Sequence, residues 1–173
     1  MPSSPDNLVA SRRRMVAQQL RARGIRDERV LAAFGDVPRE RFVPPERRGE
    51  AYDDHPIPIG EGQTVSQPFI VAITLEALAL KGHERVLDVG AGSGYQTALL
   101  ARLAREVYAI ERIEALTVRG AQTLAGLGVS HVQWRTGDGT LGWPEAAPFE
   151  GICCGAGGPD VPRAWLDQLA DGG

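Results

Sequence analysis

Short apolar runs alternate with longer amphipathic segments along the chain after Gly62. The short runs have the length and the β-branched content of buried strands, and the longer segments carry apolar residues at helical spacing. The predicted strands are 84–90, 106–111, 131–136 and 149–155, and the predicted helices are 68–80, 94–104, 114–126 and 162–170. This alternation predicts an α/β fold in which a parallel sheet carries helices on both faces.

The first 62 residues follow a different pattern. We expect residues 1–7 to fray, a helix over 11–23 that stops at Gly24, and a second helix with Asp27 as its N-cap. Five prolines between Val37 and Gly62 leave room only for short helices and turns. We therefore divide the chain into a helical and looped N-terminal extension, residues 1–62, and a main domain, residues 63–173.

Composition excludes several classes of protein. Of the 173 residues 43% are apolar and 24% are charged, which is an ordinary globular balance and excludes a disordered chain. No apolar stretch approaches the length of about 18 residues that spans a membrane. The start of the chain carries basic residues without an apolar stretch after them, so we expect no secretory signal and a cytoplasmic protein.

Charge and cysteine content argue against a nucleic-acid site and a metal site. Residues 1–50 hold eleven arginines against seven acids, but the acids are interspersed with the arginines, which indicates solvated helix faces rather than a nucleic-acid site. The two cysteines, Cys153 and Cys154, are adjacent and would point to opposite faces of a strand, so we expect two small buried side chains. The three histidines show no ligand spacing, and we expect no metal site.

Candidate chemistry lies at the predicted carboxyl ends of the strands, where parallel sheets bind ligands. The first strand ends in a glycine turn with Asp88 two residues before Gly90 and with Gly92, Ser93 and Gly94 after it. Its spacing is GxGxG, because Tyr95 stands where a dinucleotide fingerprint has its third glycine. This form is typical of S-adenosylmethionine sites, in which an acid such as Asp88 attracts the cationic amino group of the cofactor.

Two further acids close the next two strands. Glu111 ends the second strand, where a carboxylate can accept hydrogen bonds from both ribose hydroxyl groups. Asp138 lies between Gly137 and Gly139 after the third strand and can accept a hydrogen bond from the adenine amino group. Each acid alone can be an ordinary turn or surface residue, but three such signals at neighbouring strand ends favour an adenosyl site.

Four sequence motifs resemble one known family. GEGQTVSQPFIVA, VLDVGAGSGYQTALLA, GDGTLGWPEAAPFEGI and AYDDHPIPIG stand in the order and spacing of the protein-L-isoaspartate O-methyltransferases, and the resemblance runs from about Met15 to Gly173. It implies a Rossmann-like class I methyltransferase sheet with a helical N-terminal extension. It also implies transfer of a methyl group from S-adenosylmethionine to the carboxylate of L-isoaspartyl residues in damaged proteins. We expect a monomer at full length and, from the charge and hydropathy patterns, no nucleic-acid or membrane partner.

The resemblance also assigns roles to residues. Ser66 corresponds to the family's active-site serine and would orient the substrate carboxylate, although its place before Gln67 and Pro68 equally suits an N-cap, and the two roles are compatible. Gln63 and Thr64 are further candidates for cofactor and substrate contacts. Arg112 either borders the adenosyl pocket or is a solvated arginine.

Two features depart from the family. The stretch from Cys153 to Gly158 replaces an alanine-rich segment with one that holds extra glycines, which we expect to loosen that loop. The family continues with further strands beyond Gly173, so we expect a truncated member with an open edge at its last strand. Such a chain should aggregate or bind the cofactor weakly, and its methylation activity should be much reduced. Two alternatives stay open: a methyltransferase with another acceptor, such as a small molecule or RNA, and a non-catalytic module that binds the cofactor.

Overall fold

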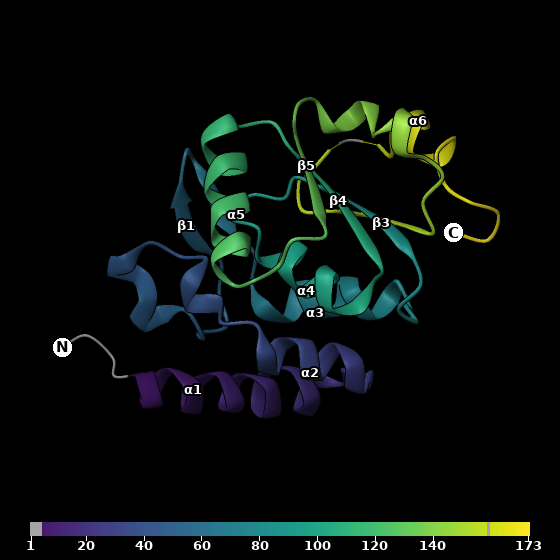
Figure 1. Cartoon of the computed structure of the whole chain (residues 1–173). Helices are drawn as coiled ribbons and strands as arrows, with labels where there is room; N and C mark the ends of the chain where they lie inside the picture. Colours follow the sequence, from purple (N-terminus) through teal and green to yellow (C-terminus); the bar gives the residue numbers. More distant parts are fainter. Residues whose placement is uncertain (1–4, 159) are drawn as a thin grey trace. The chain divides into compact units, whose positions relative to one another are not determined.

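The computed structural model of the chain describes residues 5–158 and 160–173 (Figure 1). The chain divides into two compact units, Met1–Ala79 and Leu80–Gly173, and we describe each by itself. Within the described residues, no helix has both the length and the apolar character needed to cross a membrane.

The first unit is mainly helical, with one two-stranded sheet. Its elements in chain order are α1 (Pro5–Arg14), η1 (Met15–Leu20), η2 (Arg21–Arg23), α2 (Glu28–Asp36), η3 (Arg39–Arg41), η4 (Pro45–Glu50), β1 (Ile57–Gly60), β2 (Gln63–Val65) and α3 (Pro68–Ala77). Here η1 is a π-helical turn, and η2, η3 and η4 are 3₁₀ helices.

The first two helical segments begin and end for local reasons. Helical backbone runs from Pro5 to Arg23, so helix begins earlier than the predicted residue 11, and residues 1–4 lie outside the described residues. The expected fraying of residues 1–7 stays a prediction. Gly24 ends this segment with a φ of 108°, a left-handed conformation that glycine adopts without strain. Asp27 is the N-cap of α2, as predicted, because its side chain accepts hydrogen bonds from the N–H groups of Arg29 and Val30.

Helix α3 belongs to the first unit and not to the main domain in which the sequence prediction placed it. Its Glu76 carboxylate accepts hydrogen bonds from the main-chain N–H groups of Arg26 (2.6 Å) and Asp27 (2.7 Å), just before α2 begins. Helix α3 also contacts η1 and α2 directly. The division therefore falls after Ala79 rather than after residue 62, because these contacts join segments far apart in the sequence.

The hairpin of β1 and β2 corrects the prediction that residues 37–62 hold only short helices and turns. The two strands are antiparallel, and Ile57 pairs with Val65. Both side chains are buried, at 0% and 6% exposure. Pro58 is tolerated in this two-stranded sheet because every strand in it is an edge strand, which does not need a hydrogen-bond donor at each position.

The second unit is an α/β domain. Its elements are β3 (Arg85–Val89), α4 (Tyr95–Leu103), β4 (Glu106–Glu111), α5 (Glu114–Gly126), β5 (Val132–Thr136), η5 (Gly139–Leu141), η6 (Pro144–Ala146), β6 (Gly151–Cys154) and α6 (Arg163–Leu166). The strands lie in the order β5-β4-β3-β6 and all pairs are parallel; Figure 1 shows β5, β4 and β3 side by side. The parallel sheet and its four strands are confirmed.

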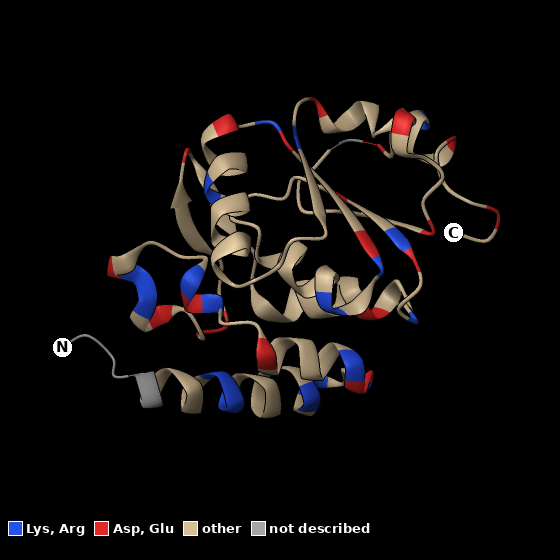
Figure 2. Cartoon of the chain, in the orientation of Figure 1, with Lys and Arg blue, Asp and Glu red and all other residues tan. Residues whose placement is uncertain are grey.

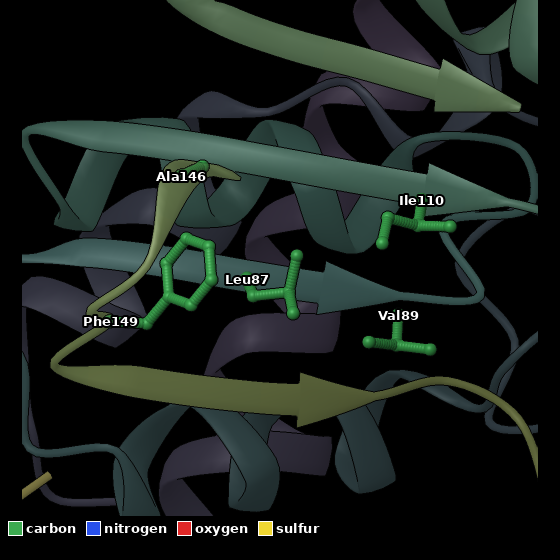
Figure 3. Close-up of a cluster of buried hydrophobic side chains, with 5 residues drawn as sticks. All are labelled: Leu87, Val89, Ile110, Ala146 and Phe149. Carbon is green, nitrogen blue, oxygen red and sulfur yellow. The ribbon is translucent and has the colours of Figure 1, made fainter. Parts of the chain in front are cut away.

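The two faces of this sheet are covered differently. Asp88 of β3 points toward α4, because it accepts a hydrogen bond from Thr97 of that helix. Its neighbours Leu87 and Val89 point to the opposite face, where they form a cluster with Ile110, Ala146 and Phe149 (Figure 3). Trp143 and Trp165 pack against the same cluster. Helices α4 and α5 therefore cover one face, and 3₁₀ turns, aromatic side chains and Trp165 of α6 cover the other.

The last helix is shorter than predicted. Helix α6 ends at Leu166, whereas the sequence predicts helix to residue 170. The main chain of Phe149, just before β6, donates to the carbonyl oxygen of Gln168 and accepts from the N–H of Ala170, each at 2.9 Å. This pairing draws the segment after α6 alongside the start of β6, and a helix cannot make it. A tertiary contact thus overrides the helical spacing of the sequence.

Candidate cofactor site

The glycine turn after β3 has the backbone that only glycine adopts easily. Gly90, Gly92 and Gly94 have φ angles of 76°, 56° and 86°. The N–H groups of Gly90 and Ala91 both donate to the carbonyl oxygen of Ile110 in β4, at 2.8 and 3.1 Å. The turn is thereby held at the tip of two neighbouring strands, and it leads directly into the N-terminus of α4.

Glu111 connects this turn to the end of β4. One carboxylate oxygen accepts from the N–H of Gly92 (2.9 Å) and the other from the N–H of Ile113 (2.8 Å). The residue is 7% exposed. A carboxylate offers about four acceptor positions, so each oxygen can accept a further hydrogen bond from a ligand at this position.

Asp88 is placed differently from the other two acids. It is fully buried: one oxygen accepts from Thr97 Oγ1 (2.6 Å), and the other accepts from Gln96 Nε2 (2.9 Å) and Cys153 Sγ (3.6 Å). Burial raises the pKa of Asp88 and outweighs these hydrogen bonds, which lower it. The carboxylate is therefore held by the protein's own donors rather than directed outward.

Asp138 and Gly139 lie at the same end of the sheet. Oδ1 of Asp138 accepts from the N–H and the hydroxyl of Thr140 (2.9 and 2.8 Å), and these bonds, together with the charge of Arg112, lower the pKa of Asp138. A Cβ on Gly139 would lie 2.5 Å from Val89 Cγ1, so this turn passes directly over the tip of β3. The structure thus brings the tips of three strands together around Gly92 and Glu111.

The remaining candidates lie in the first unit. Gln63 and Thr64 are exposed in β2, and Ser66 follows at intermediate exposure. The interpretation of Ser66 as an N-cap was wrong: Gln67 is the N-cap of α3, and no side chain makes a capping hydrogen bond there. The carbonyl oxygen of Ser66 instead accepts from Arg39 Nη2 at 2.9 Å.

The cysteines and the loop after them partly match expectation. Cys153 is buried as predicted, but Cys154 is only partly buried and packs against the opposite face of the sheet. The loop that follows passes close to the glycine turn, since a Cβ on Gly155 would lie 2.8 Å from the carbonyl oxygen of Gly90. Gly155 therefore permits a close approach, which the expectation of a loosened loop did not anticipate.

Sequence reasoning missed Gln96, Thr97 and Arg39. Gln96 and Thr97 stand directly after the glycine motif in the first turn of α4, so their spacing from Asp88 is a usable signal. Arg39 gave no such signal, because it lies among many arginines in a Pro-rich segment. The interpretation of this region as solvated holds for Arg21, Arg23 and Arg47, which form exposed ion pairs, but not for Arg39, which is 0% exposed; Figure 2 shows how basic and acidic segments intermix there.

Solved structures define the class of this fold. The chain aligns with a protein-L-isoaspartate O-methyltransferase at a TM-score of 0.82 and 29% identity, over 94% of this chain and 53% of that one. It also aligns with a protein-L-isoaspartate O-methyltransferase of Plasmodium falciparum, solved with S-adenosyl-L-homocysteine, at a TM-score of 0.78 and 26% identity, over 90% of this chain and 78% of the other. The fold is that of the S-adenosylmethionine-dependent methyltransferases of class I.

The sequence comparisons are more specific. Residues 11–173 match the family described as protein-L-isoaspartate(D-aspartate) O-methyltransferase. A relative named protein-L-isoaspartate O-methyltransferase 2, from Marinobacter nauticus, is 60% identical over 173 residues, which is 100% of this chain and 79% of the relative. The chain belongs to the protein-L-isoaspartate O-methyltransferase family, whose members transfer a methyl group from S-adenosylmethionine to L-isoaspartyl carboxylates of proteins.

Proposed function

We propose that the second unit holds S-adenosylmethionine across the tips of β3, β4 and β5. Glu111 accepts hydrogen bonds from the two ribose hydroxyl groups, and Oδ2 of Asp138 accepts one from the adenine amino group. Arg112 borders the adenine. The observation that supports this arrangement is the 2.9 Å hydrogen bond from the Gly92 N–H to Glu111, which keeps the glycine turn and the ribose-binding acid side by side. When bound, the cofactor supplies an electrophilic methyl group.

The residues present fit an adenosyl group. Gly90, Ser93 and Gly94 form a turn that allows close approach of a ligand to the main chain, directly before the N-terminus of α4, which no side chain caps. Gly139 leaves the surface beside Val89 without a side chain. We assign Asp88 an attraction for the cofactor's amino group that acts through its charge, because its oxygens already accept hydrogen bonds from Thr97 and other protein donors.

We further propose that Ser66 orients the isoaspartyl carboxylate, with Gln63 and Thr64 contributing contacts to cofactor and substrate. The nucleophile is the substrate carboxylate, which is already ionised at neutral pH, so no general base is required. What the protein must supply is orientation of the carboxylate oxygen against the methyl group, a proximity effect. A hydroxyl donor such as Ser66 can hold one carboxylate oxygen and leave the other to react.

The setting of the enzyme is also a proposal. We propose a cytoplasmic monomer that binds neither nucleic acid nor membrane. Both cysteines are free thiols, which suits a reducing compartment. Exposed arginines of the first unit pair with acids, as in the ion pairs Arg21–Glu28 and Arg23–Asp54, which leaves less positive charge for a phosphate backbone.

The proposal is tested by methyl transfer to matched peptides. An isoaspartyl peptide should be methylated, and the same peptide with normal aspartate should not. Ser66→Ala should lower kcat roughly 10- to 150-fold, the worth of one hydrogen bond to a charged group, while the affinity for S-adenosylhomocysteine changes little.

The matched control is Ser130→Ala, which removes an exposed loop hydroxyl and should leave both quantities unchanged. Equal methylation of the two peptides would favour another acceptor. Cofactor binding without any turnover would favour a non-catalytic module.

A further inference from the structure

Arg39 is a cation buried inside the first unit. It opens the short helix η3 and has 0% exposure. Its Nε donates to the carbonyl oxygen of Ala51 at 2.7 Å, and its Nη2 donates to the carbonyl oxygen of Ser66 at 2.9 Å. One planar guanidinium therefore ties together two main-chain segments that are separated in the sequence.

A buried arginine needs such partners. Arginine is almost never fully buried unless it is paired, because removing its charge from water costs far more than burying an apolar side chain of the same size. Hydrogen bonds from a charged donor are about twice as strong as neutral ones. The two carbonyl oxygens that Arg39 contacts are therefore held more firmly than an uncharged side chain would hold them.

The segment around Ser66 has little regular structure to fix it. Strand β2 ends at Val65, and α3 begins at Pro68, so Ser66 and Gln67 stand between the two elements. The Gln67 side chain binds the carbonyl oxygen of Asp54 at 3.1 Å and does not cap the helix. The hydrogen bond from Arg39 acts on the peptide group between Ser66 and Gln67, and so on the backbone that directs the Ser66 side chain.

We propose that Arg39 is a positioning residue for the reaction: its hydrogen bond to the Ser66 carbonyl oxygen fixes the backbone from which the Ser66 hydroxyl orients the isoaspartyl carboxylate. This inference rests on the role proposed for Ser66. The proposed role of Arg39 requires no contact with the substrate. Its anchor on the other side is the carbonyl oxygen of Ala51, a residue that is itself 0% exposed.

A double-mutant cycle on the full chain tests the proposal. Lysine keeps the charge of Arg39 but has a single ammonium group that cannot span both carbonyl oxygens as the guanidinium does. Arg39→Lys should lower kcat/KM for the isoaspartyl peptide about 10-fold, equivalent to about 1.4 kcal/mol, and should change the Kd for S-adenosylhomocysteine less than about 2-fold. In the Ser66→Ala background the same substitution should cost less than about 2-fold, since the hydroxyl that Arg39 positions is gone.

A matched control separates positioning from stability. Gln19→Met removes another hydrogen bond from a side chain to the main chain of the first unit, that from Nε2 to the Tyr52 carbonyl oxygen at 2.8 Å. It should lower the unfolding temperature without lowering kcat/KM at assay temperatures well below that transition. If Arg39→Lys fails to fold, Arg39→Gln, which is neutral and can reach one carbonyl oxygen, enters the same cycle.

The outcomes are distinct. An unaffected Ser66→Ala enzyme would overturn the role of Ser66 and this proposal with it. A normal loss in Ser66→Ala combined with an equal cost of the Arg39 substitution in both backgrounds would overturn the role of Arg39 alone. An Arg39 variant that loses no more kcat/KM than Gln19→Met would do the same.

Discussion

Asp88 and Glu111 end adjacent strands, yet their surroundings differ. Asp88 of β3 is bound by the side chains of Thr97, Gln96 and Cys153, whereas Glu111 of β4 is bound by the main-chain N–H groups on either side of it. Asp88 is 0% exposed beneath its side-chain donors, whereas Glu111 is 7% exposed and each of its oxygens can accept a further hydrogen bond. The difference supports the proposal that Glu111 contacts the ligand directly and that Asp88 acts through its charge.

At the residue scale, Glu111→Ala should weaken cofactor binding. The substitution removes the proposed ribose acceptor and leaves the N–H groups of Gly92 and Ile113 without their partner. The Kd for S-adenosylhomocysteine should rise roughly 10- to 150-fold, and kcat at saturating cofactor should change much less. Isothermal titration calorimetry measures the affinity. Glu114→Ala, an exposed acid in the first turn of α5, is the control and should bind as the wild type does; an unchanged Kd in Glu111→Ala would refute the assignment.

At the scale of elements, the helices of the second unit depend on close approach at glycines. A Cβ on Gly120 in α5 would lie 2.8 Å from Trp134 Cη2 in β5, and a Cβ on Gly94, at the start of α4, would lie 3.2 Å from the same atom. Trp134 therefore packs against two helices at positions where neither has a side chain. The Trp134 side chain thus connects α4 and α5 to β5, next to the end of the glycine turn at Gly94.

Gly120→Ala should therefore destabilise the protein. Forcing a methyl group into this contact should cost about 1–3 kcal/mol of unfolding free energy, as overpacking of a core does. The matched control is Gly35→Ala in α2, where nothing lies within 4 Å of the added Cβ. That change should stabilise the protein by about 0.5–1 kcal/mol because alanine loses less entropy in a helix. Urea denaturation measures both, and a neutral Gly120→Ala would contradict the packing argument.

The turn before β3 gives a pH-dependent prediction. Glu84 is buried, which works to raise its pKa, but N–H groups including those of Lys81 (2.7 Å) and Gly82 (2.7 Å) outweigh burial and lower the pKa of Glu84 below its ordinary value. A lowered pKa in the folded state means that the stabilisation is complete above the unfolded pKa of about 4.3 and is lost as the pH falls through the folded pKa.

Glu84→Gln should show this window. Its unfolding free energy should lie below that of the wild type by a constant amount between about pH 6 and pH 8, and the gap should narrow as the pH falls below about 4.3. Urea unfolding at a series of pH values measures the gap. A gap that stays constant down to the acid transition would show that the charge of Glu84 contributes nothing.

At the scale of the whole molecule, the acids and glycines proposed to hold the adenosyl group and all three tryptophans lie in the second unit, Leu80–Gly173. Tryptophan fluorescence therefore reports on the unit that we expect to bind S-adenosylhomocysteine. A ligand at about 100 times its Kd should add about 2.7 kcal/mol of unfolding free energy. The midpoint of thermal unfolding, followed by fluorescence, should rise by roughly 5–10 °C. Glu111→Ala should lose most of this rise at the same ligand concentration. A midpoint that does not change when the ligand is added would count against the site.

What the sequence by itself determined is local. Strands 85–89 and 106–111, the N-cap at Asp27 and the left-handed glycines of the turn after β3 follow from periodicity and from backbone angles that only certain residues adopt. The family also follows from sequence, because the motifs are contiguous stretches whose order and spacing are visible without a structure.

What only the tertiary structure decided depends on contacts between distant residues. The hairpin of β1 and β2 forms although Pro58 lies within it, and α6 ends early because the chain after it pairs with Phe149. The enclosure of Asp88 by α4 and the burial of Arg39 against Ser66 are likewise set by what the fold brings alongside each side chain. The periodicity of the sequence shows which residues are apolar. It does not show which distant residue will pair with a buried charge, because that partner comes close only when the chain folds.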